Sequence, residues 1–158
     1  MTNLPQALDT FRRGAEIMAE ALRGTTRDEA TFVSAPGKWT IRQLVRHVAD
    51  TEIVVGMRMR QIIAEDKPTL IPFDQELWAA HLGYETADVS DSLARFRSLR
   101  EDTAAVLSAL PPEAFERVGV HPERGAKTLL EWVVLFGNHV ETHATQIRGI
   151  RASFASKK

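Results

Sequence analysis

The sequence predicts an all-α protein, most simply a four-helix bundle, and three observations lead to this prediction. Four segments place apolar residues at the alternating three- and four-residue spacing of an amphipathic helix. No segment shows the sustained alternation of apolar and polar residues that a strand of a real sheet needs. The length of 158 residues favours one domain, residues 1–158, with a single core.

The first two predicted helices are marked by periodicity and by their starts. The first spans about 4–22, on a stripe spaced by threes and fours, and a glycine follows where a left-handed cap is common. The second begins at Thr40, because Thr40 and Gln43 have the spacing of a capping box. Its pattern lasts to about Ala64, and the proline at Pro68 prevents it from continuing.

The third and fourth helices are read in the same way. The third covers about Val89 to Leu110 and ends at a pair of prolines. The fourth opens at Thr128, where Glu131 completes a second capping box, and it reaches Ile150 or slightly beyond.

The three connections between these helices are long. In the middle one, Asp74 to Leu82 resembles a minor helix, and in the last one, Phe115 to Val120 is either irregular or briefly extended. Connections of this length do not force neighbouring helices to be antiparallel, so the residues alone leave the bundle topology open.

The composition restricts the class of function. The net charge of −1 provides no basic field for nucleic acid or an anionic membrane. No segment has the uncharged apolar length of a membrane span, and the first residues do not resemble a signal peptide, so we expect a cytoplasmic protein. Cysteine is absent, which excludes disulfides, thiolate ligands and a cysteine nucleophile. Any thiol would have to arrive as a cosubstrate.

Three histidines form the leading candidate site. His139 and His143 lie four residues apart on the inward stripe of the fourth helix, where Leu or Ile would be expected. Side chains at this spacing lie one above the other and can bind one ion. His47 lies on the inward face of the second helix. We therefore predict a divalent-metal site on His47, His139 and His143; the alternative for each is a hydrogen-bonded core histidine.

Supporting residues follow from spacing. A ligating imidazole usually donates its other N–H to a carboxylate, carbonyl or water. Gln43 and Asp50 flank His47, and Gln146 follows His143 by three residues. Each is a candidate partner or an ordinary polar surface residue.

The long loops contain candidates for the lining of a pocket. These are Trp78, Phe73 and His121, although the same residues could simply pack the loops against the bundle. His81 is expected to be structural or exposed.

The motifs around the three histidines resemble those of a known family. Residues 38–47, KWTIRQLVRH, resemble the W-[ST]-x-x-x-[LV]-x-x-H signature of the DinB/YfiT-like superfamily. Residues 139–147 resemble its H-x3-H-x2-Q-I motif, and residues 73–80 and 121–125 are also similar to that family. The resemblance extends over nearly the whole chain. One departure is Val140, where many relatives have Asp.

The resemblance implies a bundle with up-up-down-down topology, a divalent metal on His47, His139 and His143, and a homodimer. It also implies an activity, because the superfamily includes thiol-dependent S-transferases, a maleylpyruvate isomerase that uses low-molecular-weight thiols, and proteins labelled as metal-dependent hydrolases or damage-inducible proteins.

The expected function is therefore that of a metal-dependent enzyme. Three neutral ligands leave the ion its full charge, which acidifies a thiol or water for attack on a small electrophilic substrate. The expected metal is zinc or nickel, with a low-molecular-weight thiol as possible cosubstrate. The alternative is a non-catalytic, metal-stabilised, stress-related binding protein. No nucleic-acid or membrane partner is expected.

Overall fold

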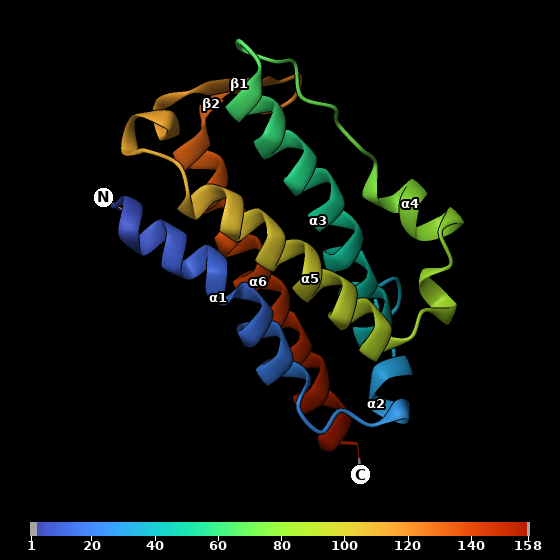
Figure 1. The fold of residues 1–158 in the computed structure, drawn as a ribbon. Coiled ribbons are helices and arrows are strands. Elements are labelled where there is room, and N and C mark those ends of the chain that lie inside the picture. Colours follow the sequence, from blue (N-terminus) through green and yellow to red (C-terminus); the bar gives the residue numbers. More distant parts are fainter. Residues whose placement is uncertain (1–2, 158) are drawn as a thin grey trace.

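The computed structural model describes residues 3–157, and it is built around four long helices (Figure 1). These are α1 (Leu4–Leu22), α3 (Ile41–Ala64), α5 (Val89–Ser108) and α6 (Leu129–Ala155). The shorter elements are α2 (Arg27–Thr31), α4 (Gln75–His81), the 3-10 turns η1 (Tyr84–Thr86) and η2 (Pro112–Glu116), and the strands β1 (Val118–His121) and β2 (Gly125–Thr128). The all-α class, the four long helices and the minor helix in the middle connection are confirmed.

The starts of the two site-bearing helices follow the sequence closely. The Thr40 hydroxyl accepts the backbone N–H of Gln43, and the Gln43 side chain accepts the backbone N–H of Thr40. Thr128 and Glu131 make the same reciprocal pair at the start of α6. Each capping box satisfies backbone donors that a helix N-terminus leaves unpaired, so α3 and α6 begin at defined residues.

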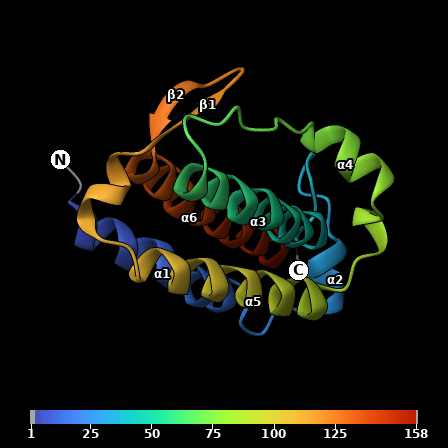
Figure 2. The same ribbon diagram turned by 45° about the horizontal axis from the view of Figure 1, so that its top comes forward.

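The directions of the helices differ from the up-up-down-down order that we expected. Gly14 of α1 adjoins Val140 of α6, and further along both helices the carbonyl of Ala21 accepts a hydrogen bond from Arg151. The contacts follow the same order in both helices, so α1 runs parallel to α6. α3 and α5 are parallel to each other and antiparallel to this pair. The order is therefore up-down-down-up. The physical reason is the connection 65–88, which returns along the outside of the bundle before α5 begins (Figure 2).

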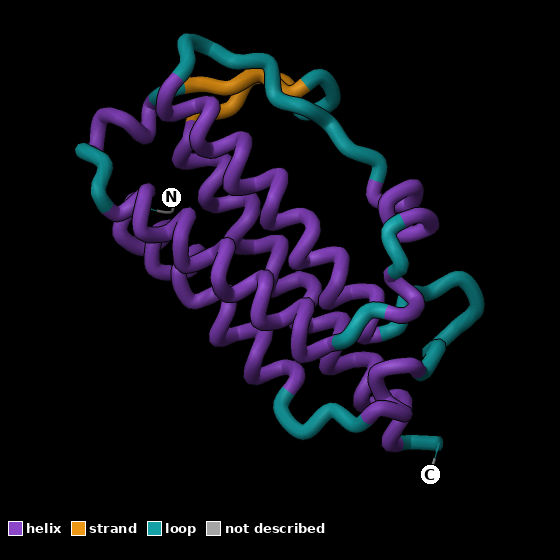
Figure 3. The backbone as a smooth tube through the Cα atoms, turned by 45° about the vertical axis from the view of Figure 1, so that its right-hand side comes forward, coloured by secondary structure: helices purple, strands orange, loops and turns teal. Residues whose placement is uncertain are grey.

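A short antiparallel hairpin is the second difference. Residues 118–121 pair with residues 125–128, where the sequence indicated at most a brief extended segment. The hairpin lies at the end of the bundle where α3 stops and α6 starts (Figure 3). Arg117 fastens it there, since its Nε donates to the carbonyl of Ile62 at 2.7 Å.

The core is divided by a layer of polar side chains. One apolar cluster surrounds Met18 and Phe96, and the other surrounds Phe11 and Trp132. Between them on α3, Glu52 is buried and pairs with the buried Arg100 of α5. The bundle therefore carries charged groups at mid-height.

Within residues 3–157, no helix combines the length and the apolar character that a membrane-spanning segment needs.

Candidate metal centre

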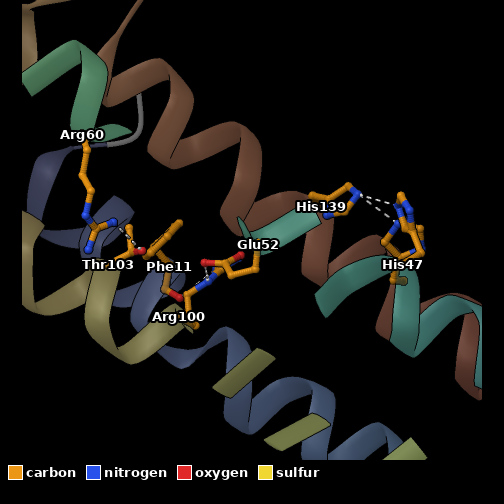
Figure 4. A network of polar contacts seen from close by, with 8 residues as sticks. Phe11, His47, Glu52, Arg60, Arg100, Thr103 and His139 are labelled. Atoms are coloured by element: carbon orange, nitrogen blue, oxygen red, sulfur yellow. Dashed lines mark hydrogen bonds and ion pairs between the residues drawn. The ribbon is translucent and has the colours of Figure 1, made fainter. Parts of the chain in front are cut away.

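The structure brings His47, His139 and His143 to one point between α3 and α6. The Nε2 atom of His139 lies 3.4 Å from Nε2 of His47 and 3.0 Å from Nε2 of His143. One ring nitrogen from each of the three lies within 4.8 Å of the others. Figure 4 shows His47 on α3 facing His139 on α6. His47 is buried, and the other two side chains are partly buried.

These separations fit one small cation. Zn–N distances of about 2.0–2.1 Å with tetrahedral angles place neighbouring ligand nitrogens about 3.3 Å apart. The separations of 3.0 and 3.4 Å at His139 lie on either side of this value. Hydrogen bonds cannot fully explain such a cluster, because each neutral imidazole carries one N–H and one lone pair.

The protonation state also fits ligand chemistry. Burial lowers the pKa of His47 to about 4 and, together with the neighbouring His143 and His47, lowers the pKa of His139 to about 3. Burial lowers the pKa of His143 as well, although its hydrogen bond to Gln146 opposes this. All three rings are therefore neutral at pH 7, and neutral imidazole is the form that coordinates a metal.

Gln146 orients one of the rings. Its Oε1 lies 2.7 Å from Nδ1 of His143, so Nδ1 carries the proton and donates. The lone pair of Nε2 is then directed at the other two histidines. Of the partners predicted from spacing, Gln146 is the one that contacts a site histidine.

Gln43 and Asp50, the candidate partners of His47, make other contacts. Gln43 is occupied by the capping box of α3, and Asp50 pairs with Arg46 one turn along the same helix. Among the described residues, Nδ1 of His47 is buried and has no hydrogen-bond partner. The indole of Trp39 packs against this ring instead, with ring centroids 5.1 Å apart. Trp39 precedes the cap of α3, so helical spacing gave no signal for this contact.

The residues expected to line a pocket, Trp78, Phe73 and His121, lie in two different parts of the structure. Trp78 packs against Phe73 with the ring centroids 4.7 Å apart and the rings tilted by 47°, in the connection outside α3, and His81 is exposed. His121 is buried beside Trp132, whose ring is followed along α6 by those of Phe136 and His139. Phe73 and Trp78 line a separate apolar cleft between α3 and α4.

A cleft opens beside the cluster. Its volume is about 760 Å³, and His143 and Gln146 lie in its wall together with Trp39, Leu44 and Ile150. Lys38, Gln75 and Glu76 supply polar groups at its border. A small molecule in this cleft would contact His143 of the cluster from the side of α6.

The charged pair at mid-height was not foreseen. Arg100 donates to both oxygens of Glu52, at 2.8 and 2.7 Å, and to the carbonyl of Phe11, and Figure 4 shows these contacts on another side of α3 from His47. Charged residues on an inward stripe were the available signal. The pair holds α1, α3 and α5 in register behind the metal centre.

Comparison with known proteins finds a matching family and relatives that are named for a metal-dependent activity. A profile described as the DinB superfamily matches residues 10–147. A protein from Bacillus cereus strain 03BB102, named "Putative metal-dependent hydrolase", is 32% identical over 150 residues, covering 92% of this chain and 86% of that protein. One from Oceanobacillus iheyensis with the same description is 28% identical over 114 residues, covering 72% of this chain and 66% of the relative.

The fold has a close counterpart among solved structures. YfiT from Bacillus subtilis, described as "a probable metal-dependent hydrolase with an unusual four-helix bundle topology", superimposes with a TM-score of 0.90. The match covers 98% of this chain and 91% of YfiT at 24% sequence identity. This match establishes the bundle and its topology.

Proposed function

This chain belongs to the DinB superfamily, and we propose that it is a metal-dependent enzyme that acts on a small electrophilic substrate. His47, His139 and His143 would hold one divalent cation, with zinc or nickel as the expected metal. A low-molecular-weight thiol or water would be the nucleophile, so that the reaction is an S-transfer or a hydrolysis.

The observation that carries the proposal is the convergence of three neutral ring nitrogens beside an open cleft. Structural zinc sites usually have four protein ligands, whereas catalytic sites keep one position for water or substrate. Among the described residues, the ligand cluster contains no carboxylate or fourth histidine. The cleft beside His143 would give a small molecule access to the remaining position.

The chain's own residues have separate tasks in this proposal. Gln146 holds the tautomer of His143, and Trp39 covers the ring of His47. Trp39, Leu44 and Ile150 offer an apolar wall to the substrate. The cation supplies a Lewis acid that lowers the pKa of a thiol or of water.

Metal content and spectroscopy test this proposal. We expect about one equivalent of metal per chain after loading and desalting, and a large loss in His139→Ala but not in His81→Ala. In cobalt-loaded protein, a small thiol such as 2-mercaptoethanol should change the visible spectrum if a coordination position is open. A stoichiometric cobalt spectrum that ignores thiols and other added ligands would instead support the non-catalytic, metal-stabilised protein.

Activity assays separate the two nucleophiles. An activated ester without thiol tests hydrolysis, and an aryl halide with a panel of cellular thiols tests S-transfer, each with wild-type protein and His139→Ala. Rates that depend on the loaded metal and on the thiol would assign an S-transferase. Metal-loaded protein with an open position but no rate above His139→Ala in either assay would contradict the enzyme proposal.

We also propose that the chain forms a homodimer and works in the cytoplasm. The support is its membership of the superfamily, together with a net charge of −1, which adds little repulsion between copies. Sedimentation equilibrium should give twice the chain mass of 17.6 kDa. A concentration-independent mass of one chain would contradict the dimer.

A further inference from the structure

Arg58 of α3 is a buried cation that makes no ion pair within 4.0 Å among the described residues, and the Glu123 carboxylate acts on it only from a longer distance. The residue is 5% exposed. Its guanidinium donates to the carbonyl of Ile71 from Nε and Nη2 and lies between the rings of Phe73 and Trp132, 5.9 and 5.8 Å from their centroids. Within residues 3–157, the other arginine buried to this degree is Arg100, and it forms an ion pair with Glu52. A buried charge normally needs a counter-charge.

His121 beside it receives more donors than it can accept. The backbone N–H of Glu123 points to Nδ1 at 3.2 Å, and Nη2 of Arg58 lies 3.1 Å from Nε2. Arginine has donors alone, and a neutral imidazole accepts at one nitrogen. Because burial and Arg58 both lower the pKa of His121, the ring is neutral. With Nδ1 accepting from Glu123, Nε2 carries a proton and faces another donor.

An unsatisfied donor lies beside Arg58 and His121. Trp132 is 1% exposed, and its Nε1 has no hydrogen-bond partner among the described residues. Its ring centroid lies 5.9 Å from that of His121. The indole N–H of Trp132 therefore has no acceptor, while His121 faces two donors with a single lone pair and Arg58 has only the carbonyl of Ile71, which is unusual for buried polar groups.

This cluster lies on the same helix faces as the metal centre. Arg58 follows His47 by eleven residues, about three full turns, so both project from one face of α3. Trp132 precedes His139 by seven residues, about two turns or 10 Å along α6. The stacked rings of Trp132 and Phe136 connect the two places.

We infer that Arg58, His121 and Trp132 form a recognition site for the carboxylate of a small molecule with an apolar body. A carboxylate accepts from a guanidinium, an indole N–H and an imidazole N–H at once, which removes the donor conflict. Phe73 and Ile71, which contact Arg58, also line an apolar cleft of about 740 Å³ between α3 and α4. That cleft provides space for the apolar part.

If the chain is the proposed enzyme, the inference names its substrate class: small molecules with a carboxylate and an apolar body. Only this assignment of a substrate class rests on the proposed function. Binding of the carboxylate itself needs no metal. The test therefore uses the full chain after removal of metal with a chelator, so that the result is independent of the metal centre.

The experiment follows the indole N–H signals of nitrogen-15-labelled protein by NMR during titration with sodium benzoate. The chain has three tryptophans, and Trp132→Phe identifies the signal of Trp132 by its loss. We expect a saturable shift of that signal, at least tenfold weaker binding in Arg58→Met, and unchanged binding in Arg60→Met, which removes an exposed arginine of the same helix. Acetate should bind more weakly than benzoate.

Several results would overturn the inference. These are the absence of a saturable shift, equal benzoate affinity in Arg58→Met, or tighter binding of inorganic phosphate than of benzoate. Arg58 also anchors the backbone at Ile71, so Arg58→Met could unfold the connection. In that case His121→Phe replaces it: this variant keeps Arg58 and its contact with Ile71, and it should also weaken benzoate binding at least tenfold.

Discussion

Metal binding at the three histidines should make the melting temperature depend on free metal. A ligand that binds one site of the folded chain stabilises it by about 1.4 kcal/mol for each tenfold rise in free ligand above Kd. For a chain of this length, 1 kcal/mol corresponds to about 2–4 °C. The melting temperature should therefore rise by about 3–6 °C per tenfold increase in free zinc, whatever the value of Kd.

His139→Ala is the perturbation that tests the geometry. Its Nε2 makes both short contacts, 3.4 Å to His47 and 3.0 Å to His143, so its loss leaves two nitrogens without the central one. Loss of a hydrogen bond that merely supports a ligand costs about 10–100-fold in affinity, and loss of the ligand itself should cost about 100-fold or more. At a zinc concentration that stabilises wild-type protein, we compare the rise in melting temperature that zinc causes in each protein over its own metal-free form. This rise should be at least about 5–11 °C smaller in the variant than in wild-type protein.

Scanning calorimetry in a non-chelating buffer, with metal-buffered free zinc, measures this difference. His81→Ala is the matched control, because His81 is exposed and lies outside the cluster. The reasoning fails if wild-type melting ignores zinc, nickel and manganese. It also fails if His139→Ala rises with the same onset and slope as wild-type protein.

Three further predictions concern the surroundings of the site. Gln146→Leu should weaken zinc binding by about 10–100-fold, whereas Gln146→Glu should keep much of the affinity because a carboxylate also accepts from Nδ1 of His143. Competition with a chromophoric chelator measures the zinc affinity of both variants. Affinities equal to that of wild-type protein in both variants would contradict the orienting role of Gln146. Without metal, the folded pKa values of His47 and His139, about 4 and about 3, lie below 6.5, so the unfolded chain takes up protons first. Stability of the metal-free chain should be complete above pH 7 and fall from pH 6.5 towards 4, and urea denaturation that is equal at pH 7.5 and 5 would disprove this. Glu52→Gln should cost about 3–5 kcal/mol because it leaves Arg100 buried and unpaired, whereas Asp102→Asn, in the exposed pair with Arg60, should cost under about 1 kcal/mol; similar urea midpoints for both would be inconsistent with this difference.

The parts of the fold that the sequence predicted are those set by neighbouring residues. Both capping boxes, at Thr40 and Thr128, depend on side chains three residues apart, so their spacing was sufficient. His139 and His143 are also local, because one turn of any α-helix places them together. The contact between His143 and Gln146 has the same origin, and it is the supporting contact that spacing identified correctly.

Other features depend on paths and contacts that spacing does not describe. The direction of α5 depends on the course of residues 65–88 around the bundle, and nothing in their composition requires them to return along its length. The strands of the hairpin have four residues each, too few for an alternating pattern to be distinctive. Gln43 and Asp50 have suitable spacing from His47, but the helix cap and Arg46 take their polar atoms.

The sequence by itself therefore determined the four helices, the residues at which they start, and the placement of His139 and His143 one turn apart on one helix face. Only the tertiary structure decided that His47, 92 residues before His139, completes the set. It also decided that Glu52 forms an ion pair with Arg100, whereas Arg58 forms none within residues 3–157. The physical reason is that a helix relates side chains within a few turns by fixed geometry. Distances between helices depend on the packing of the whole bundle.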